Sequence, residues 1–533
     1  MTNWTAWSAT AAAPSSRARA TLTRELGPLT PAHVVPLERV TVPPSQLPPE
    51  VRDRLVSALG AAHVRDDDAT RARHAGGQAY VDLVRRRRGD AQAAPDAVLL
   101  PGDADDVRSV LRVCTDARIA VVPWGGGTSV VGGLDPERGG HEAVVALDLS
   151  RMAALVSVDR TSLLATFQPG ITTPAAEAAL AEHGLRLGHV PQSYERASLG
   201  GYAVTRSAGQ SSTGVGRFDD LVAGLRLVTP IGDLDLAPVA GSAAGPDLRR
   251  LVLGSEGVLG VVTELTVRVR PIATARHYEG WMTRDWESGL RLMRRLAQEG
   301  PRPDIARLSD EPETAVSMAM SSTGATTRRA LGAYLRLRRV DAGCLVITGY
   351  EGSDRDVQHR RREVRRLLRD EHAVALGPSA GRAWEHARFA APALRDTMLD
   401  EGLLAETLET AATWTVLPDL YRRVRSALTE ALGHAVVGCH VSHLYSSGAS
   451  LYFTVLAAAD TGSEPEQWAG AKAAANDAIV AAGGTITHHH AVGTAHRGHV
   501  ARDLGGEVGV VALRAVKQAL DPAGVLNPGK LLP

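Results

Sequence analysis

The chain has 533 residues, of which 44% are hydrophobic and 22% are charged, and its formal net charge is zero. A chain of this length and composition buries a full core in two or three domains, which excludes a disordered or fibrous protein. Its 59 basic residues are balanced by 59 acidic ones. We therefore expect no general attraction to nucleic acid.

The three cysteines, Cys114, Cys344 and Cys439, lie far apart along the chain. Their odd number and wide spacing indicate neither a disulfide framework nor a cysteine-rich metal site, and they suit a reducing compartment. No run of about 18 apolar residues is present, so we expect no membrane span. The first 20 residues lack the basic start and apolar core of a secretory signal. These features predict a cytoplasmic protein.

The first half of the chain has the pattern of a mixed α/β unit with short elements. Residues 1–50 are rich in proline, alanine and serine and are typical of an extended arm. The spacing of apolar residues then predicts helices over residues 49–60, 103–117 and 173–183. Strands are predicted over residues 97–100, 119–123, 143–147 and 163–167.

The pattern changes after Pro271. Helices are predicted over residues 290–298, 357–369, 421–432, 471–480 and 508–519, and strands over residues 345–350, 435–443 and 451–456. We predict an N-terminal arm with helices over residues 1–94, a first domain over 95–272 and a second over 273–500. The tail, residues 501–533, is expected to return to the first domain.

A glycine loop follows a predicted strand at residues 123–133, which read PWGGGTSVVGG. Glycines allow backbone N–H groups to converge on an anion, and the hydroxyls of Thr128 and Ser129 add donors. The loop lacks the Gly-Lys-Ser/Thr of nucleotide triphosphate loops and the Gly-x-Gly-x-x-Gly helix start of dinucleotide folds. By itself it is compatible with a pyrophosphate cradle or with a simple tight turn.

Two further segments, residues 191–209 and 253–262, also combine glycines with small hydroxyl side chains. In this order, the three segments resemble the FAD-binding domain of the vanillyl-alcohol oxidase and p-cresol methylhydroxylase superfamily. The resemblance implies an α+β fold, in which a two-part FAD-binding domain of the p-cresol methylhydroxylase type joins a substrate (cap) domain with an antiparallel sheet flanked by helices. One departure is the turn at residues 192–195, which reads QSYE where the family has an acidic turn.

The resemblance implies FAD as the cofactor, and the first glycine loop offers no His, Cys or Tyr for a covalent link, so we expect the FAD to be non-covalent. The residues expected to contact it are Pro123, Trp124, Gly125, Gly126, Gly127, Thr128, Ser129, Gln192, Ser193, Tyr194, Glu195, Arg196, Ala197, Ser198, Thr205, Arg206, Ser207, Ala208, Ser255, Glu256, Gly257, Val258, Leu259, Gly260 and Val261.

The second half of the chain resembles one family within this superfamily. Residues 487–493 (THHHAVG), 439–445 (CHVSHLY) and 448–453 (GASLYF) are similar to alkylglycerone-phosphate synthases. In that family the fatty acid of an acylated dihydroxyacetone phosphate is exchanged for a fatty alcohol through a substrate–flavin adduct, and the flavin ends oxidised. The resemblance therefore implies a small-molecule or lipid substrate in ether lipid synthesis, a homodimer and a peripheral membrane contact.

The same resemblance assigns catalytic roles to Tyr452, His488, His489, His490 and Arg307. An imidazole titrates near neutrality and can move a proton, although exposed histidines on a strand would have the same sequence. In a regular strand, His488 and His490 would share one face and His489 would take the other. Tyr452 could equally be a packing aromatic, and Arg307 a structural ion pair.

Arg395 matches a residue that holds the substrate in this family. A guanidinium fork suits this role because it can bind a phosphate or a carboxylate through two hydrogen bonds. His440 and His443 have no family role and would lie on opposite faces of a regular strand. A polar core or pocket wall is the favoured interpretation for this pair, with a metal pair as the minor one. We predict no bound metal.

A flavin dehydrogenase of D-2-hydroxy acids is the alternative function. That branch typically has Gly-His-x-Gly-Asp-Gly-Asn-x-His and then Ser-Gly-Glu-His-Gly-Ile-Gly, whose His and Glu bind a metal. His489 stands where this Glu is expected, so the metal-dependent interpretation weakens. A flavin-binding protein without catalysis is disfavoured by the intact set of His, Tyr and Arg residues.

Overall fold

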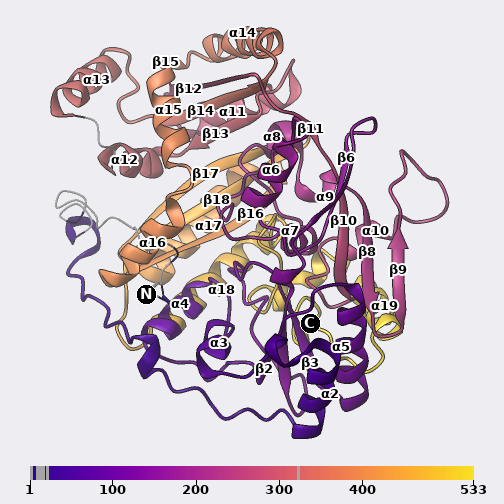
Figure 1. Cartoon of the computed structure of the whole chain (residues 1–533). Helices are drawn as coiled ribbons and strands as arrows, with labels where there is room; N and C mark the ends of the chain where they lie inside the picture. Colours follow the sequence, from indigo (N-terminus) through magenta and orange to yellow (C-terminus); the bar gives the residue numbers. More distant parts are fainter. Residues whose placement is uncertain (1–3, 6, 8–18, 20–22, 321–323) are drawn as a thin grey trace.

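The computed structural model describes the chain except for residues 1–3, 6, 8–18, 20–22 and 321–323. The predicted arm therefore falls partly outside the described residues. Three sheets position the site, and the long strands β16, β17 and β18 run side by side across the middle of the molecule (Figure 1). Among the described residues, no helix combines the length and apolar character that crossing a membrane requires.

The first sheet has four strands in the order β1-β2-β4-β3, with β2, β4 and β3 parallel. Its bounds are β1 Val64–Arg65, β2 Ala97–Leu99, β3 Ala120–Trp124 and β4 Val144–Asp148. Helices α2 (Pro49–Leu59) and α5 (Ala104–Ala117) bury their apolar stripes against it. The C-terminal tail lies beside β3, because Val121 donates to the carbonyl of Val525 and accepts from Asn527 N–H.

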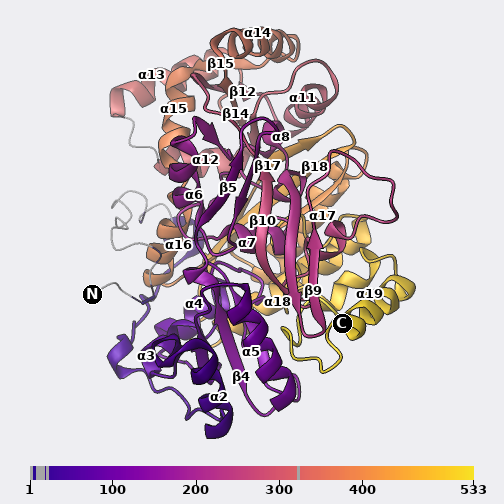
Figure 2. The same ribbon diagram turned by 45° about the vertical axis from the view of Figure 1, so that its right-hand side comes forward.

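The second sheet is antiparallel, with the order β5-β6-β10-β8-β9 (Figure 2). Its bounds are β5 Leu155–Asp159, β6 Leu164–Phe167, β10 Val261–Arg268, β8 Val222–Thr229 and β9 Gly232–Leu236. Helices α6 (Thr173–Ala181), α7 (Leu199–Thr205) and α9 (Phe218–Leu221) contribute to the core of this sheet. These two sheets supply the glycine-rich segments of the site.

The third sheet is antiparallel and has seven strands in the order β15-β12-β14-β13-β17-β18-β16. Its bounds are β12 Ala275–Thr283, β13 Ile305–Ser309, β14 Cys344–Gly352, β15 Val374–Gly377, β16 Leu403–Thr413, β17 Ala435–Tyr445 and β18 Gly448–Ala458. Helices α11 (Trp286–Gln298), α14 (Asp354–Asp370), α17 (Leu417–Leu432) and α18 (Glu464–Ala482) share its core.

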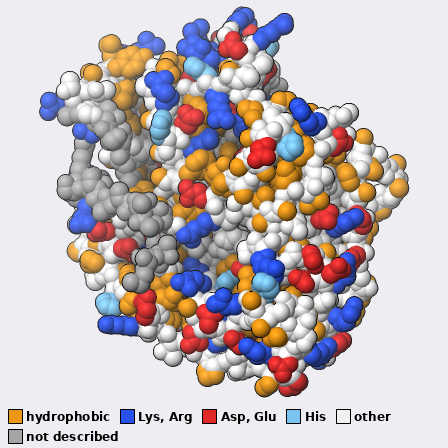
Figure 3. Space-filling model, viewed as in Figure 1, with side chains coloured by type: hydrophobic (Ala, Val, Ile, Leu, Met, Phe, Trp, Pro, Cys, Tyr) orange, Lys and Arg blue, Asp and Glu red, His pale blue; other side chains and the backbone are white. Residues whose placement is uncertain are grey.

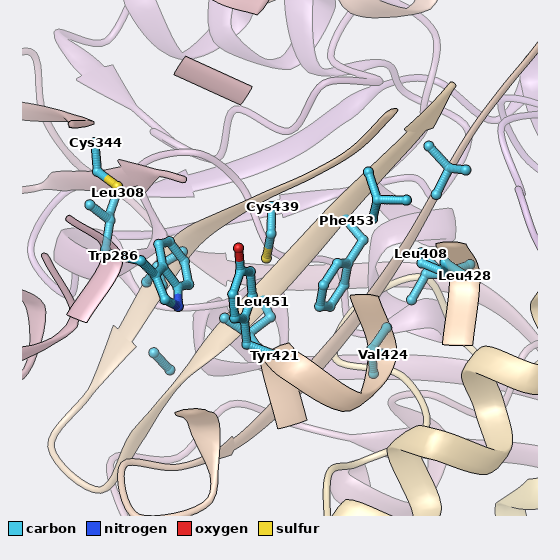
Figure 4. Packing of buried hydrophobic residues seen from close by; sticks show 14 of the residues in the cluster. Trp286, Leu308, Cys344, Leu408, Tyr421, Val424, Leu428, Cys439, Leu451 and Phe453 are labelled. Carbon is cyan, nitrogen blue, oxygen red and sulfur yellow. The ribbon is translucent and has the colours of Figure 1, made fainter. Parts of the chain in front are cut away.

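Alternation along β18 gives this sheet one apolar face and one face for chemistry. Leu451 and Phe453 are buried with Tyr421 of α17 and Trp286 of α11, and Cys439 of the neighbouring strand joins them (Figure 4). Tyr452, between the two buried residues, points to the opposite side and lines a cavity. The packing thus fixes which side chains of the sheet reach the site.

The remaining elements are connections and covering helices. Two short strands, β7 Leu185–Arg186 and β11 Arg270–Pro271, pair with each other. The other elements are η1 Leu37–Arg39, η2 Ala61–His63, η3 Leu149–Arg151, η4 Arg497–Arg502, α3 Asp68–Arg73, α4 Tyr80–Arg87, α8 Ser212–Val215, α10 Arg249–Val252, α12 Glu311–Met320, α13 Ala325–Leu337, α15 Pro378–Ala387, α16 Ala391–Asp400 and α19 Glu507–Leu520.

The largest difference from the sequence-based elements is β16, which was not predicted. Its sequence, LLAETLETAAT, consists largely of residues that favour helices. It forms a strand because it pairs along its whole length with β18. Tertiary pairing therefore overrides local preference in the strand that carries Glu406 and Glu409.

Candidate active site

A cavity of about 500 Å³ lies between the glycine-rich segments and the face of β16, β17 and β18 that carries Tyr452. The loop after β3 forms one wall, together with residues 191–193, most of residues 197–210, and residues 256, 257 and 260–262. Side chains of the seven-stranded sheet, of α12 and α16, and of residues 489–491 form the other wall. One wall is thus mostly backbone and small side chains, and the other carries titratable groups.

The glycine loop fits a phosphate-containing cofactor. A Cβ on Gly126 would lie 2.0 Å from the carbonyl oxygen of Arg196, so no larger residue can stand there without a backbone shift. Within the described part of the chain, the backbone N–H groups of residues 126–129 have no hydrogen-bond acceptor. Free N–H groups on a tightly packed glycine loop are the donor set that a pyrophosphate requires.

Most of the residues predicted to contact FAD line the cavity. They are Pro123, Trp124, Gly125, Gly126, Gly127, Thr128, Ser129, Gln192, Ser193, Ala197, Ser198, Thr205, Ser207, Ala208, Glu256, Gly257, Gly260 and Val261. The others do not: Tyr194, Glu195, Arg196, Arg206, Ser255, Val258 and Leu259.

Four of these seven residues use their side chains elsewhere. Val258 and Leu259 belong to an apolar cluster with Val492. Tyr194 stacks on Phe389 with ring centroids 5.2 Å apart. Arg206 pairs with Asp219 at 3.0 Å.

Glu409 of β16 organises the loop that carries the three histidines. Its buried carboxylate accepts the backbone N–H groups of His488, His489 and His490 at 2.6, 3.1 and 2.9 Å. It also accepts the hydroxyl of Thr487 at 2.6 Å. Consecutive N–H groups can converge on one carboxylate only if the chain bends, so these residues do not form a strand.

The bend changes which histidines face the site. His489 and His490 line the cavity, whereas His488 does not. Both ring nitrogens of His488 are engaged, Nε2 with the hydroxyl of Tyr445 at 2.6 Å and Nδ1 with Nδ1 of His489 at 2.9 Å. The pairing of His488 with His490 that a regular strand would give is therefore wrong.

Burial sets the protonation of these groups. Burial alone would raise the pKa of the Glu409 carboxyl, but the neighbouring histidines, His489 first, outweigh it and hold the pKa well below its usual range. Burial and the neighbouring His489 lower the pKa of His490 to about 3. Glu409 is therefore charged and His490 neutral at pH 7.

The ring of Tyr452 contacts the imidazoles of His440, His489 and His490. The His440 ring lies 4.8 Å from the Tyr452 ring at 23°, and the His489 ring lies 6.0 Å away at 21°. The phenol donates to the Thr407 hydroxyl at 3.0 Å. Burial raises its pKa to about 12, so it is a neutral proton donor at pH 7.

The two predicted arginines both line the cavity but differ in their partners. Arg307 pairs with Glu313 and lies 3.0 Å from Nδ1 of His440. Arg395 lies 3.8 Å from Glu406, and its Nε is buried with no hydrogen-bond partner. Arg395 thus retains donor capacity for an anion, whereas the charge of Arg307 is largely balanced inside the protein.

His440 and His443 both line the cavity, although a regular strand would separate them. The pairing of β17 with β18 shifts register between Val441 and Leu444, which is the sign of a β-bulge. The interpretation as pocket-wall residues therefore fits both of them.

The nitrogens of His443, His488 and His489 lie within 4.8 Å of one another. The rings of His443 and His488 are stacked at 21°, and both nitrogens of His488 are engaged. These distances would allow the three nitrogens to share a metal ion, although a metal would have to displace a partner of His488, and the absence of a metal stays a prediction.

Several residues of the site had no sequence signal. Glu409, Glu406 and Thr407 come from the unpredicted β16, and Glu313 lies on α12. Trp7 also lines the cavity; its backbone N–H donates to Asp396, and its ring lies 4.8 Å from the Arg196 guanidinium. The tryptophan-rich start of the chain, with Trp4 and Trp7, is a faint sequence signal for this residue. In the sequence of β16, the local signal is an apolar pattern interrupted by acidic residues, and that pattern is also typical of an amphipathic helix.

Comparison with known proteins gives two family matches along the chain. Residues 95–235 match the model of an FAD binding domain, and residues 272–531 match the C-terminal domain of FAD linked oxidases. The alkyldihydroxyacetonephosphate synthase of Trypanosoma brucei brucei is 31% identical over 92% of this chain and 82% of its own length. The chain belongs to the alkyldihydroxyacetonephosphate synthase family.

This family name is another name for the alkylglycerone-phosphate synthases. A solved structure of such a synthase superposes with a TM-score of 0.85 at 26% identity, covering 99% of this chain and 98% of the other. An uncharacterized FAD-linked oxidoreductase of Escherichia coli, YgcU, is 30% identical over 82% of this chain and 89% of its own length. The predicted FAD cofactor is confirmed.

The predicted fold class is also confirmed. A p-cresol methylhydroxylase structure superposes with a TM-score of 0.68 at 16% identity, covering 90% of this chain and 96% of the other. The likeness at this identity concerns the fold alone. It agrees with the two antiparallel sheets and the mixed helices of this synthase family member.

The glycine loop of this family member can be tested by Gly126→Ala. The added methyl group collides with the Arg196 carbonyl, so we expect the Kd for FAD to rise at least about tenfold, a loss of about 1.4 kcal/mol. The measurement is FAD titration followed by flavin fluorescence. Gly241→Ala, where nothing lies within 4 Å, is the control. Equal FAD affinity in both variants would contradict the cradle.

Glu409→Gln tests the carboxylate that bends the histidine loop. The amide keeps the size but offers one oxygen to four donors and turns an NH₂ group toward some of them. We expect the free energy of unfolding to fall by about 2 kcal/mol or more. Urea unfolding with saturating FAD measures this, and the exposed Glu430→Gln on α17 is the control. Unchanged stability would show that the carboxylate does not hold the loop.

Proposed function

We propose that this protein exchanges the fatty acyl group of an acylated dihydroxyacetone phosphate for a fatty alcohol, forming an ether lipid precursor. The observation that carries the proposal is a cavity that joins an anion-binding guanidinium, Arg395, to the Tyr452 and histidine group. Apolar residues complete this wall, among them Leu394, Met398 and Leu456. A phosphate head and an aliphatic chain both find matching surroundings there.

Each residue has a role that follows from its environment. Arg395 binds the substrate phosphate with its unused donor. Neutral His490 and its neighbour His489 accept the proton of the substrate carbon, and Tyr452 donates or takes a proton beside them. Bound FAD would supply the electron-pair acceptor for that carbon. Glu409 holds the two imidazoles in place.

His488 and Arg307 have less direct roles in this proposal. His488 faces away from the cavity and positions His489 through their shared ring contact. Arg307 stabilises Glu313 inside the wall. Both remain predicted contributors to catalysis, and both act through a neighbour.

An FAD-dependent dehydrogenase of a D-2-hydroxy acid is the second candidate. Arg395 could bind a carboxylate as well as a phosphate, which is the observation that favours it. The two functions differ in what happens to the flavin. A dehydrogenase leaves reduced flavin and needs an external acceptor, whereas the exchange reaction needs none.

The deciding experiment supplies acylated dihydroxyacetone phosphate and a long-chain alcohol without oxygen or dye. We expect an ether product and free fatty acid over many turnovers, with the flavin still oxidised at the end. Mass spectrometry measures the product and absorbance at 450 nm follows the flavin. Flavin bleached by D-lactate, with turnover only when a dye is added, would instead establish the dehydrogenase.

Tyr452→Phe tests the acid/base role. It removes one hydroxyl and one hydrogen bond to Thr407, so the free energy of unfolding should change by about 1 kcal/mol. The exchange rate should fall about 100-fold or more, since the proton path loses its phenol. Tyr334→Phe on the exposed helix α13 is the matched control. Full turnover in Tyr452→Phe with FAD retained would refute the role.

We also propose that FAD is bound without a covalent link. The three cysteines are free and buried, and none lines the cavity. The glycine loop at residues 123–129 contains no nucleophilic imidazole, thiol or phenol. Acid precipitation should therefore leave the flavin in the supernatant. A yellow pellet would contradict this.

We propose further that the protein is a cytoplasmic homodimer that touches the membrane peripherally and binds no nucleic acid. Arginines of α13 and α14 gather at the top of the molecule, and Leu337 beside them is 81% exposed (Figure 3). Such a surface suits anionic lipid headgroups. Light scattering tests the dimer, and sedimentation with phosphatidylglycerol vesicles tests the membrane contact. A monomer, or vesicles that recover no protein, would overturn the corresponding part.

A further inference from the structure

His440 is a third imidazole in the wall of the cavity, and it belongs to a different element from the histidine loop. It lies on β17, directly opposite Tyr452 of β18 in the register of the two strands. Its ring is buried and nearly parallel to the Tyr452 ring. It therefore faces the same reaction space as His489 and His490 from the sheet side.

A carboxylate holds this imidazole. Oε2 of Glu313 lies 3.0 Å from Nδ1 of His440. The other oxygen, Oε1, accepts from Arg307 and from the Ser309 hydroxyl. Burial alone would raise the pKa of Glu313, but His440 and Arg307 outweigh it and lower the pKa to about 2. Glu313 is charged at pH 7.

The tautomer of His440 follows from satisfying that carboxylate. In the described part of the chain, Oε2 of Glu313 has no donor except Nδ1 of His440. Nη2 of Arg307, which can only donate, also lies 3.0 Å from Nδ1, but it already donates to Oε1 of Glu313. Two lone pairs facing each other at 3.0 Å would repel, so we assign the hydrogen to Nδ1, which donates it to Oε2. Nε2 then has a free lone pair, and it has no partner among the described residues.

The imidazole is a base rather than a fixed cation. Burial first, and then the nearby Arg307, lower its pKa below the ordinary value, while Glu313 opposes them. It is neutral at pH 7 and can accept a proton. A carboxylate that orients Nδ1 while Nε2 faces the reaction space is the arrangement by which proteins present a general base.

We propose that His440, oriented by Glu313, is a second catalytic base, which accepts the hydroxyl proton of the incoming alcohol. The inference rests on the proposed exchange function and adds to it a residue for the second half of the reaction. The histidine loop held by Glu409 then serves the proton of the substrate carbon. Two carboxylates, Glu409 and Glu313, orient two separate bases around Tyr452.

The step balances without an external oxidant. The bond between the substrate carbon and the acyl oxygen breaks, and the fatty acid leaves as a carboxylate with the bonding pair. The alcohol oxygen forms the new bond to that carbon, and its O–H bond breaks. The proton passes to Nε2 of His440 and returns to solvent. Ester and alcohol thus give ether and acid, with no net change in the oxidation level of the flavin.

The experiment compares His440→Asn with the wild type in the anaerobic exchange reaction, using two long-chain alcohols of different acidity. Asn keeps a donor toward Glu313 and removes Nε2. With an ordinary alcohol we expect the ether-forming rate to fall about 100-fold. With an alcohol fluorinated next to its hydroxyl group, which loses its proton more readily, the deficit should shrink at least tenfold.

Two further variants separate catalysis from structure. Glu313→Gln should show the same dependence on alcohol acidity with a smaller deficit, because it misorients the base without removing it. Exposed His434→Asn, just before β17, is the matched control and should behave as the wild type. FAD content and urea midpoint are measured for each protein. If His440→Asn does not retain FAD, Glu313→Gln carries the test.

The outcomes are distinguishable. A deficit in His440→Asn that shrinks with the acidic alcohol supports the inference. Wild-type rates in His440→Asn and Glu313→Gln, or a deficit that is the same for both alcohols, would overturn it and leave the proposed function standing. A wild-type protein that forms no ether would overturn the proposed function and this inference with it.

Discussion

The buried carboxylate of Glu409 is the constraint on which the site depends. It gathers three successive backbone N–H groups and one hydroxyl, which is possible only because the chain bends at His488 to His490. A buried charge is costly unless it is fully satisfied, so the bend and the charge stabilise each other. The consequence is chemical, because the bend turns His489 and His490 toward Tyr452 and turns His488 away.

The cavity has two walls, one that fits the cofactor and one that carries the reacting side chains. On the cofactor side, a packed glycine loop presents backbone N–H groups whose positions cannot easily change, as the space around Gly126 shows. On the substrate side, side chains alternate along β17 and β18. The apolar ones pack against α17, and the polar ones point into the cavity. The rigid core behind Tyr452 and His440 therefore holds the reacting side chains in place.

Local sequence signals predicted the parts of the fold that local interactions determine. The helix α5, with its aspartate cap and apolar stripe, and the glycine loop after β3 are examples. Strand β16 was missed because its Leu, Ala and Glu residues favour a helix, and only pairing with β18 makes it a strand. The orientations of His443 and His489 were also beyond local reasoning, since a β-bulge and a distant carboxylate set them.

Two imidazoles beside Tyr452, those of His440 and His490, are neutral and oriented at physiological pH, and the proposed chemistry depends on this. Nitrogen NMR of the FAD-bound protein, labelled with ¹⁵N-histidine and compared with a His490→Gln variant for assignment, measures it most directly. Because burial lowers the pKa of His490 to about 3, the account predicts one protonated and one bare ring nitrogen from pH 8 down to pH 5. A His490 ring that carries protons on both nitrogens at pH 6 would contradict the account.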